Sequence, residues 1–229
     1  MKKALWLFVL AWALQSVCMA ASVKQLPNGN EVDLRAYQQK QGTLNVLAAP
    51  FDGAQMYLGA FNFDSRESDG KMAFSRGIGI FADQAAQQEL RPLLVKQVSG
   101  SAEGFSEQMV NKDGTAPYKH NMHAVQTGSR VPVIYIGGDS TNMVMIGRFA
   151  VTTGGGNFDD CIGIKIYNDK TGEGMVQYLA KDHGIVYLEG VRPDGSAAAI
   201  VELHEIRGMD EEAADNFKQK YFTDAASAN

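Results

Sequence analysis

Residues 161–191 decide the fold class; they read CIGIKIYNDKTGEGMVQYLAKDHGIVYLEGV. Three runs rich in Ile, Val, Tyr and Leu, at 161–167, 174–180 and 184–191, are separated by short polar connections that contain glycine and aspartate. In the first run the isoleucines occupy alternate positions, which is the period of a strand with one buried face. Short runs of this kind joined by turn residues predict neighbouring antiparallel strands.

The same pattern continues through most of the chain. We expect further strands at 56–63, 71–81, 93–98, 105–110, 123–127, 131–137, 143–153 and 198–206. Predicted helices do not alternate regularly with these runs, so a doubly wound parallel fold is disfavoured. The sequence therefore predicts a mainly β protein: a single curved antiparallel sheet, or a partly open β-barrel, with one or two packed helices.

The stronger helix prediction covers residues 210–222. Asp210 is a suitable N-cap, and two glutamates follow it in the first turn, where negative charge stabilises a helix. Ala213, Phe217 and Tyr221 recur at intervals of four residues and so share one face. We expect this apolar face to pack on the sheet.

Two other intervals have helical features. Residues 82–91 are rich in Ala, Gln, Glu and Leu and precede Pro92, which cannot continue a helix. Residues 31–40 offer a short helix that Gly42 would end. The surrounding region, 21–55, has the least informative pattern in the chain.

The first 20 residues have the three parts of a bacterial secretory signal. Lys2 and Lys3 precede an apolar run at 4–14, and small residues lead up to Ala20. The run is too short to span a bilayer, so we predict cleavage after Ala20 and no membrane span. Lipidation of Cys18 is the alternative, although Val17 is bulky for that kind of site.

This secretory signal predicts a periplasmic or secreted protein. Removal of 1–20 leaves 21–222 as a single β-rich domain, followed by a small polar tail at 223–229 that we expect to be frayed. Cys161 would be the remaining cysteine, so a disulfide within one mature chain is excluded. It is expected to pack as a small buried side chain rather than to react.

Composition excludes some partners. The chain has 21 basic and 26 acidic residues, and its basic residues form no cluster. Nucleic acids and anionic lipid surfaces bind to local positive potential, so neither is an expected partner.

One group of residues resembles a metal site. His120, Met122, His123, Met143 and Met145 combine imidazoles with thioethers, which are ligands that Cu(I) prefers. Ordinary core methionines and surface histidines explain the same residues, and we predict neither a metal nor another cofactor.

The run Gly154–Gly156 is not a phosphate loop, because a strand-like run rather than a helix follows it. Asp159 and Asp160 form an acidic pair that, with His183, would be the centre of a hydrolase. The sequence shows no burial that would separate their acid and base roles.

The stretch 149–206 resembles a known group of proteins. Residues 156–161 (GNFDDC) lead into a strand, and 178–186 (YLAKDHGIV) precede the turn 194–196 and a final strand at 200–206. This arrangement resembles the C-terminal part of secreted bacterial β-proteins of unassigned function. Such proteins are similar to the half-open barrels of periplasmic lipoprotein carriers, in which a helix plugs the concave side. The resemblance implies that 210–222 or 82–91 is a lid or plug, and it implies no catalytic residue.

We therefore expect a non-enzymatic envelope protein that binds a lipid or other apolar ligand, or a partner protein. The expected ligand-binding residues lie on the last strands and the C-terminal helix: Ile162, Ile164, Ile166, Val176, Tyr178, Phe217 and Tyr221. An ordinary core without a cavity explains the same residues. An envelope hydrolase and a structural accessory subunit of a surface or secretion apparatus are the alternatives.

The mature protein is expected to begin at Ala21. Intact-mass measurement on protein recovered from the cell envelope tests this, because cleavage after Ala20 fixes one mass. A mass that includes the first 20 residues, or a diacylated Cys18, would contradict the prediction.

Overall fold

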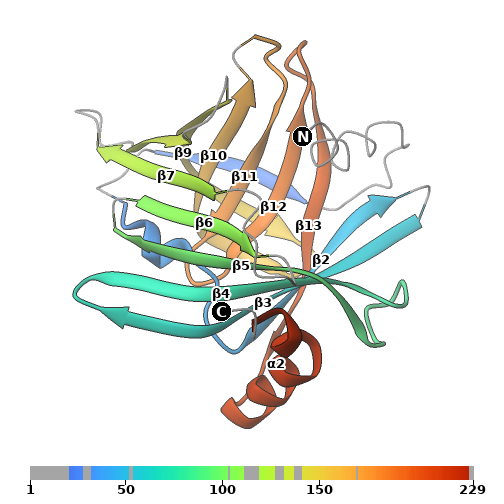
Figure 1. Ribbon diagram of the computed structural model, residues 1–229. Coiled ribbons are helices and arrows are strands. Elements are labelled where there is room, and N and C mark those ends of the chain that lie inside the picture. Colours follow the sequence, from blue (N-terminus) through green and yellow to red (C-terminus); the bar gives the residue numbers. More distant parts are fainter. Residues whose placement is uncertain are drawn as a thin grey trace.

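The computed structural model describes residues 21–27, 32–51, 54–102, 104–110, 119–126, 132–136, 141–168 and 170–226. One antiparallel sheet of 13 strands dominates it, in the order β1-β9-β10-β11-β12-β13-β2-β3-β4-β5-β6-β7-β8 (Figure 1). Its strands are β1 (Ser22–Leu26), β2 (Thr43–Phe51), β3 (Ala54–Ser68), β4 (Lys71–Phe81), β5 (Leu90–Ser101), β6 (Gly104–Val110), β7 (Lys119–Gln126), β8 (Pro132–Ile136), β9 (Thr141–Thr153), β10 (Gly156–Asn168), β11 (Gly174–Ala180), β12 (Gly184–Val191) and β13 (Ala197–Gly208).

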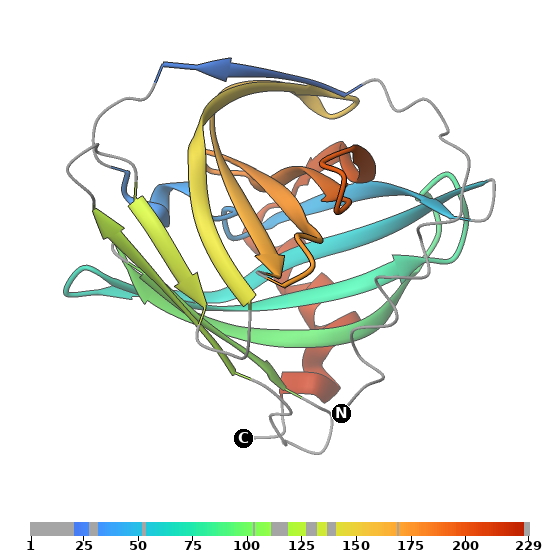
Figure 2. The same ribbon diagram turned by 90° about the horizontal axis from the view of Figure 1, so that it is seen from above.

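The predicted fold class is confirmed. Each run that we expected to be a strand is one, and all the pairings are antiparallel. In the described residues the two ends of the strand order, β1 and β8, are not paired with each other, so the sheet does not close. Figure 2 shows β9 and β10 arching away from the layer that contains β3, β4 and β5.

The sequence did not predict β1 and β2. β1 is only five residues long, at the edge of the sheet. In β2, the consecutive residues Leu44, Asn45 and Val46 are all buried, so the strand has no polar face that would produce an alternating pattern.

The order of the strands forces one long connection across the sheet. β1 pairs with β9, whereas β2 lies between β13 and β3, so β9 to β13 separate the first two strands of the chain. The chain between them includes residues 32–40, which we call the crossing segment. It contains a short 3₁₀ helix, η2 (Leu34–Tyr37), which Figure 1 shows beside β5. Residues 31–40 were therefore correctly expected to contain a short helix.

The C-terminal helix, α2 (Glu211–Ala226), packs on the other face of the sheet. Successive residues of a strand point to opposite faces. In β4, Arg76 donates to the side chain of Gln38 in the crossing segment, at 3.1 Å, whereas the neighbouring Gly77 faces the ring of Phe222 in α2. The crossing segment and α2 thus cover opposite faces of β4, and Figure 1 shows α2 below β3 and β4.

The predicted cap of α2 is confirmed. Asp210 Oδ1 accepts from the backbone N–H of Ala213 at 2.8 Å, at the start of the helix. Two residues of the predicted face, Phe217 and Tyr221, pack on the sheet, whereas the third, Ala213, is exposed. The side chains that pack on the sheet are Ala214, Phe217, Tyr221 and the fully buried Phe222.

The helix predicted at 82–91 was wrong. Residues 82–89 form an irregular connection, and Leu90 and Arg91 already belong to β5. Asp83 Oδ1 accepts from the N–H groups of Gln87 and Gln88, which closes a loop rather than a helical turn. Pro92 lies beside an irregularity in the pairing of β4 with β5, where strands tolerate proline.

The three glycines at 154–156 have a structural reason. The tip of the β9–β10 hairpin lies on β13, where Gly155 donates to the Leu203 carbonyl and Gly154 donates to Glu202 Oε1, each at 2.8 Å. A Cβ at Gly155 would lie 2.8 Å from Leu203 Cγ, and Gly156 has a positive φ of 144°. These contacts hold the hairpin against a β-bulge in β13.

Gly77→Ala is expected to displace the Phe222 ring, because its Cβ would lie 2.5 Å from Cζ of that ring. Such overpacking costs about 1–3 kcal/mol, and Phe222→Ala about 3–5 kcal/mol. The double variant should lose less than the two costs added, since both changes remove the same contact. Urea unfolding measures all three. Gly208→Ala is the control, because no atom lies within 4 Å of that site; an equal, small effect at Gly77 would contradict the packing.

Candidate functional site

The crossing segment packs against both halves of the sheet. Its apolar side chains and those of both halves of the sheet form one core cluster. The buried members of this cluster are Val32, Leu34, Tyr37, Phe74, Val98, Phe105, Met145, Ile162 and Ile164. A short piece of non-strand chain therefore joins β4, β5 and β6 to β9 and β10.

Tyr37 anchors the middle of the crossing segment. Its hydroxyl donates to Asp160 Oδ1 at 2.8 Å and accepts from Arg148 Nη2 at 3.1 Å. Arg148 also forms an ion pair with Asp160. Burial, with Asp160 as a further cause, raises the pKa of Tyr37, so its hydroxyl stays protonated and can donate.

Polar contacts also hold the C-terminal end of the segment. Asn62 Nδ2 donates to the Gln39 carbonyl at 2.7 Å, and Gln39 Nε2 donates to the carbonyls of Thr43 and Ala60. Asp182, in the β11–β12 turn, donates its backbone N–H to the Ala36 carbonyl at 2.7 Å. These hydrogen bonds surround the buried apolar side chains of the crossing segment.

The N-terminal end of the segment is tied to the β3–β4 hairpin. Asp33 caps η2 by accepting from the backbone N–H of Arg35, and it also pairs with the Arg35 guanidinium. Arg35 Nη1 donates to the Gly70 carbonyl at 2.9 Å. The Arg35 guanidinium lowers the pKa of Asp33.

A charged group lies beneath the segment on β4, β5 and β6. Arg76 donates to Asn62 Oδ1 at 3.0 Å and lies 3.8 Å from Glu107 Oε1. Lys96 Nζ is closer to the same carboxylate, at 3.1 Å from Oε2. Burial lowers the pKa of Arg76, and Glu107 acts in the opposite direction.

The expected ligand-binding residues are divided among three clusters. Ile162 and Ile164 lie in the cluster of the crossing segment, and Ile166 packs against it. Val176 and Tyr178 lie in a different core cluster. In the β10–β11 register these two face the same side as Lys165 and Gly163, which is the side opposite the isoleucines.

The two aromatic residues expected from the helix belong to a third group. Phe217 and Tyr221 pack against the cluster on the outer face, where Phe217 lies 5.0 Å from the ring of Phe61. The structure thus brings only the three isoleucines together with the crossing segment. Leu34 and Tyr37 were not predicted as site residues. Their only signal in the sequence was the mixture of apolar and polar residues before Gly42.

The residues of the hydrolase alternative have separate environments. Asp160 is paired with Arg148 and Tyr37, whereas the ring of His183 packs edge-on against Phe158 at 5.3 Å. Cys161 is a free, fully buried cysteine, and burial raises the pKa of its thiol to about 12. A thiol with that pKa is a poor nucleophile at neutral pH.

Most residues of the hypothetical copper site lie outside the part of the chain whose side chains the structure describes. The side chains of His120, Met122, His123 and Met143 are not among those described, and Met145 is buried in the cluster of the crossing segment. In the described part of the chain, no group of three His, Cys, Asp or Glu residues is placed to hold a metal ion.

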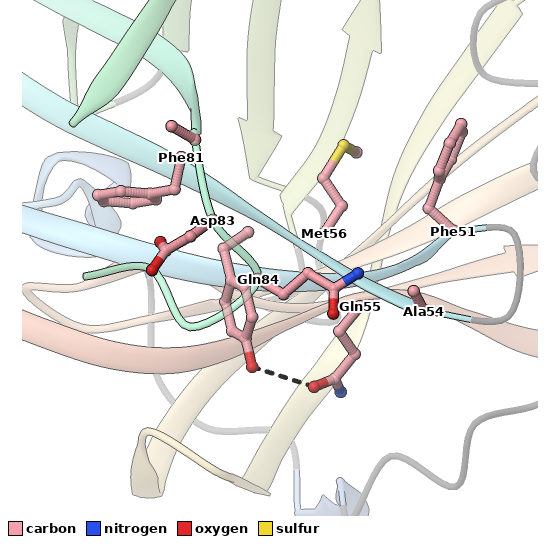
Figure 3. Close-up of a pocket in the computed structure, with 9 residues that line it drawn as sticks. Phe51, Ala54, Gln55, Met56, Phe81, Asp83 and Gln84 are labelled. Atoms are coloured by element: carbon pink, nitrogen blue, oxygen red, sulfur yellow. Dashed lines mark hydrogen bonds between the residues drawn. The ribbon is translucent and has the colours of Figure 1, made fainter. Parts of the chain in front are cut away.

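A shallow depression lies at the end of the β2–β3 hairpin. Figure 3 shows Phe51 and Phe81 at its two ends, with Asp83 and Gln84 from the connection at 82–89. Its volume is about 180 Å³, and the exposed fraction of Phe51 is 57%. A second depression, of about 410 Å³, is lined by Ala82 and residues 87–91.

No protein-family model matches the chain, and no curated protein matches it. A Bacteroides fragilis protein described as exported, with a YmcC-like fold, is 15% identical with a TM-score of 0.44, over 74% of this chain and 97% of that one. A Parabacteroides distasonis protein described as a lipoprotein is 12% identical with a TM-score of 0.48, over 78% and 100%.

Among the described residues, no helix has the length and hydropathy required to span a bilayer.

The stability of the fold is expected to fall as the pH drops below the ordinary pKa of histidine, about 6.5. Burial lowers the pKa of His183, so the folded state prefers its neutral form while the unfolded state takes up the proton. The stability that neutral His183 contributes is fully present above pH 6.5. It is lost as the pH falls toward the pKa of His183 in the folded state.

Urea unfolding at pH 8 and pH 5.5 measures this difference. His183→Gln should reduce it, whereas His204→Gln, at an exposed position, serves as the control. An unchanged pH dependence in His183→Gln would contradict the assignment.

Proposed function

We propose that this chain is a non-enzymatic, exported carrier of an apolar ligand, and that the crossing segment occupies the ligand site when no ligand is bound. The supporting observation is that Val32, Leu34 and Tyr37, from a segment outside the sheet, fill the face that carries Ile162 and Ile164. Displacement of this segment would leave an apolar surface shared by both halves of the sheet.

The energies involved indicate a long ligand. Burial of the three apolar side chains of the segment is worth about 5–9 kcal/mol, at about 1.5–3 kcal/mol each. An acyl chain gains about 0.8 kcal/mol for each buried CH₂, so about 16 carbons give about 12 kcal/mol and six carbons less than 5. Only a long chain therefore offsets the loss of the segment's apolar contacts.

Contact with a partner protein is the second candidate, and the exposed Phe51 favours it. The depression beside Phe51 has a volume of about 180 Å³, whereas small-molecule pockets occupy about 300–1,000 Å³. Its size suits a side chain of a partner protein better than a ligand. A photo-crosslinking residue at position 51 in living cells tests this candidate, and the absence of any crosslinked protein would argue against it.

Tyr37→Phe is expected to increase the binding of the neutral fluorescent probe N-phenyl-1-naphthylamine. The change keeps the ring but removes the hydroxyl that bonds to Asp160 and Arg148. Loss of about 1–2 kcal/mol from the closed state raises the open population by about 5- to 30-fold. The apparent affinity for the probe should rise by the same factor while the open state remains minor.

Tyr178→Phe is the matched control. It removes a similar tyrosine–carboxylate hydrogen bond, from Tyr178 to Glu189 at 2.9 Å, in the cluster away from the crossing segment. Its stability should decrease without a gain in probe binding. An equal gain in both variants would indicate general loosening, and no gain in Tyr37→Phe would show that the segment does not give access to a site; either result contradicts the proposal.

A further inference from the structure

We infer that the ligand of this site is an amphiphile with one long acyl chain and an anionic head, either a carboxylate or a phosphate. The inference rests on the proposed function and adds the charge of the ligand to it. It comes from the charged group that the crossing segment covers on β4, β5 and β6, which consists of Arg76, Lys96 and Glu107.

Two cations in this group share one carboxylate. Lys96 Nζ lies 3.1 Å from Glu107 Oε2, so Glu107 is engaged more closely by Lys96 than by Arg76, whose Nη1 lies 3.8 Å from Oε1. Among the described residues, Arg76 also donates to the neutral amide oxygens of Asn62 and Gln38. The exposed fractions of the three side chains are only 14% for Arg76, 22% for Lys96 and 18% for Glu107. Water therefore solvates the excess positive charge of the group poorly.

Removal of the crossing segment would leave Arg76 with a donor that has lost its acceptor. Gln38 leaves with the segment, and Arg76 Nη2 then loses the acceptor that lies 3.1 Å away. A guanidinium binds carboxylate and phosphate oxygens through paired N–H groups, which a hydroxyl or ester head offers less well. The empty position beside Arg76 would therefore favour an anionic head.

The surrounding side chains fix the direction of the acyl chain. The Arg76 guanidinium lies over the ring of Phe74, 5.3 Å from its centroid, and Phe74 belongs to the apolar cluster of the crossing segment. On the other side of this cluster, Arg148 is already paired with Asp160. The head is thus assigned to Arg76, and the chain would extend from Phe74 toward Ile162 and Ile164.

The test compares three ligands with the same 16-carbon chain, each below its critical micelle concentration: hexadecanoate, hexadecyl phosphate and the neutral monoglyceride of hexadecanoic acid. Displacement of N-phenyl-1-naphthylamine from purified protein reports their affinities. The two anions are expected to bind at least tenfold more tightly than the monoglyceride. The stronger of the two anions identifies the head as carboxylate or phosphate.

Arg76→Gln is expected to abolish the preference for anions, and Lys96→Gln to weaken it. Arg207→Gln is the matched control, because Arg207 also lies 5.3 Å from the centroid of a phenylalanine ring, that of Phe81, but belongs to the outer face. It should leave the preference unchanged. If Arg76→Gln fails to fold, Arg76→Lys should keep the preference for anions, and Lys96→Gln still tests the charge.

The outcomes separate the two proposals. Equal binding of all three ligands, or an anion preference that survives both Arg76→Gln and Lys96→Gln, would overturn the anionic head and leave the carrier function standing. Binding of none of the three to wild-type protein or to Tyr37→Phe would overturn the carrier function as well.

Discussion

The structure depends on one topological constraint: the chain must cross the sheet between its first and second strands. β1 is at the edge beside β9, and β2 is in the middle of the sheet between β13 and β3. Measured along the curved sheet, six spacings of about 4.8 Å, roughly 29 Å in all, separate these two strands. The crossing segment lies on the face of β4 opposite the face that α2 covers. The apolar side chains of the crossing segment are part of the core. Its backbone is bonded by contacts from other parts of the chain: Asn62 Nδ2 donates to the Gln39 carbonyl, and the Asp182 N–H donates to the Ala36 carbonyl.

The sheet could be predicted from the sequence because its strands have local signals. Alternating residues, as in 161–167, and glycine-containing turns mark most of the strands, and the capping residue Asp210 marks the helix. The prediction failed where contacts with other parts of the fold outweigh the local preference of the residues for a helix. The residues at 82–91 favour a helix, yet the side chain of Asp83 binds two N–H groups of a loop, and Leu90 pairs with Phe81 across the sheet.

The candidate site could be predicted only in part for the same reason. Ile162, Ile164 and Ile166 follow the period of a strand, so their common face was evident from the sequence. Tyr37 and Asp160 are 123 positions apart, and Arg76 and Gln38 are 38 apart, and no short pattern links such residues. The features that give this site its chemistry arise from contacts between distant segments.

The position of β2 has a further consequence, for the order in which the protein folds. β2 occurs early in the chain, but one of its two partners is β13, paired from Glu202 to Gly208, near the C-terminus. Until that last strand is available, the central edge of the sheet stays open, and Leu44 and Val46 cannot be fully covered by their final neighbours. Contacts between such distant parts of a sequence slow folding, because the chain loses much entropy before they form. A nascent chain would therefore leave this edge of β2 unpaired until β13 has been synthesised, and an incomplete chain would present that strand edge to other proteins.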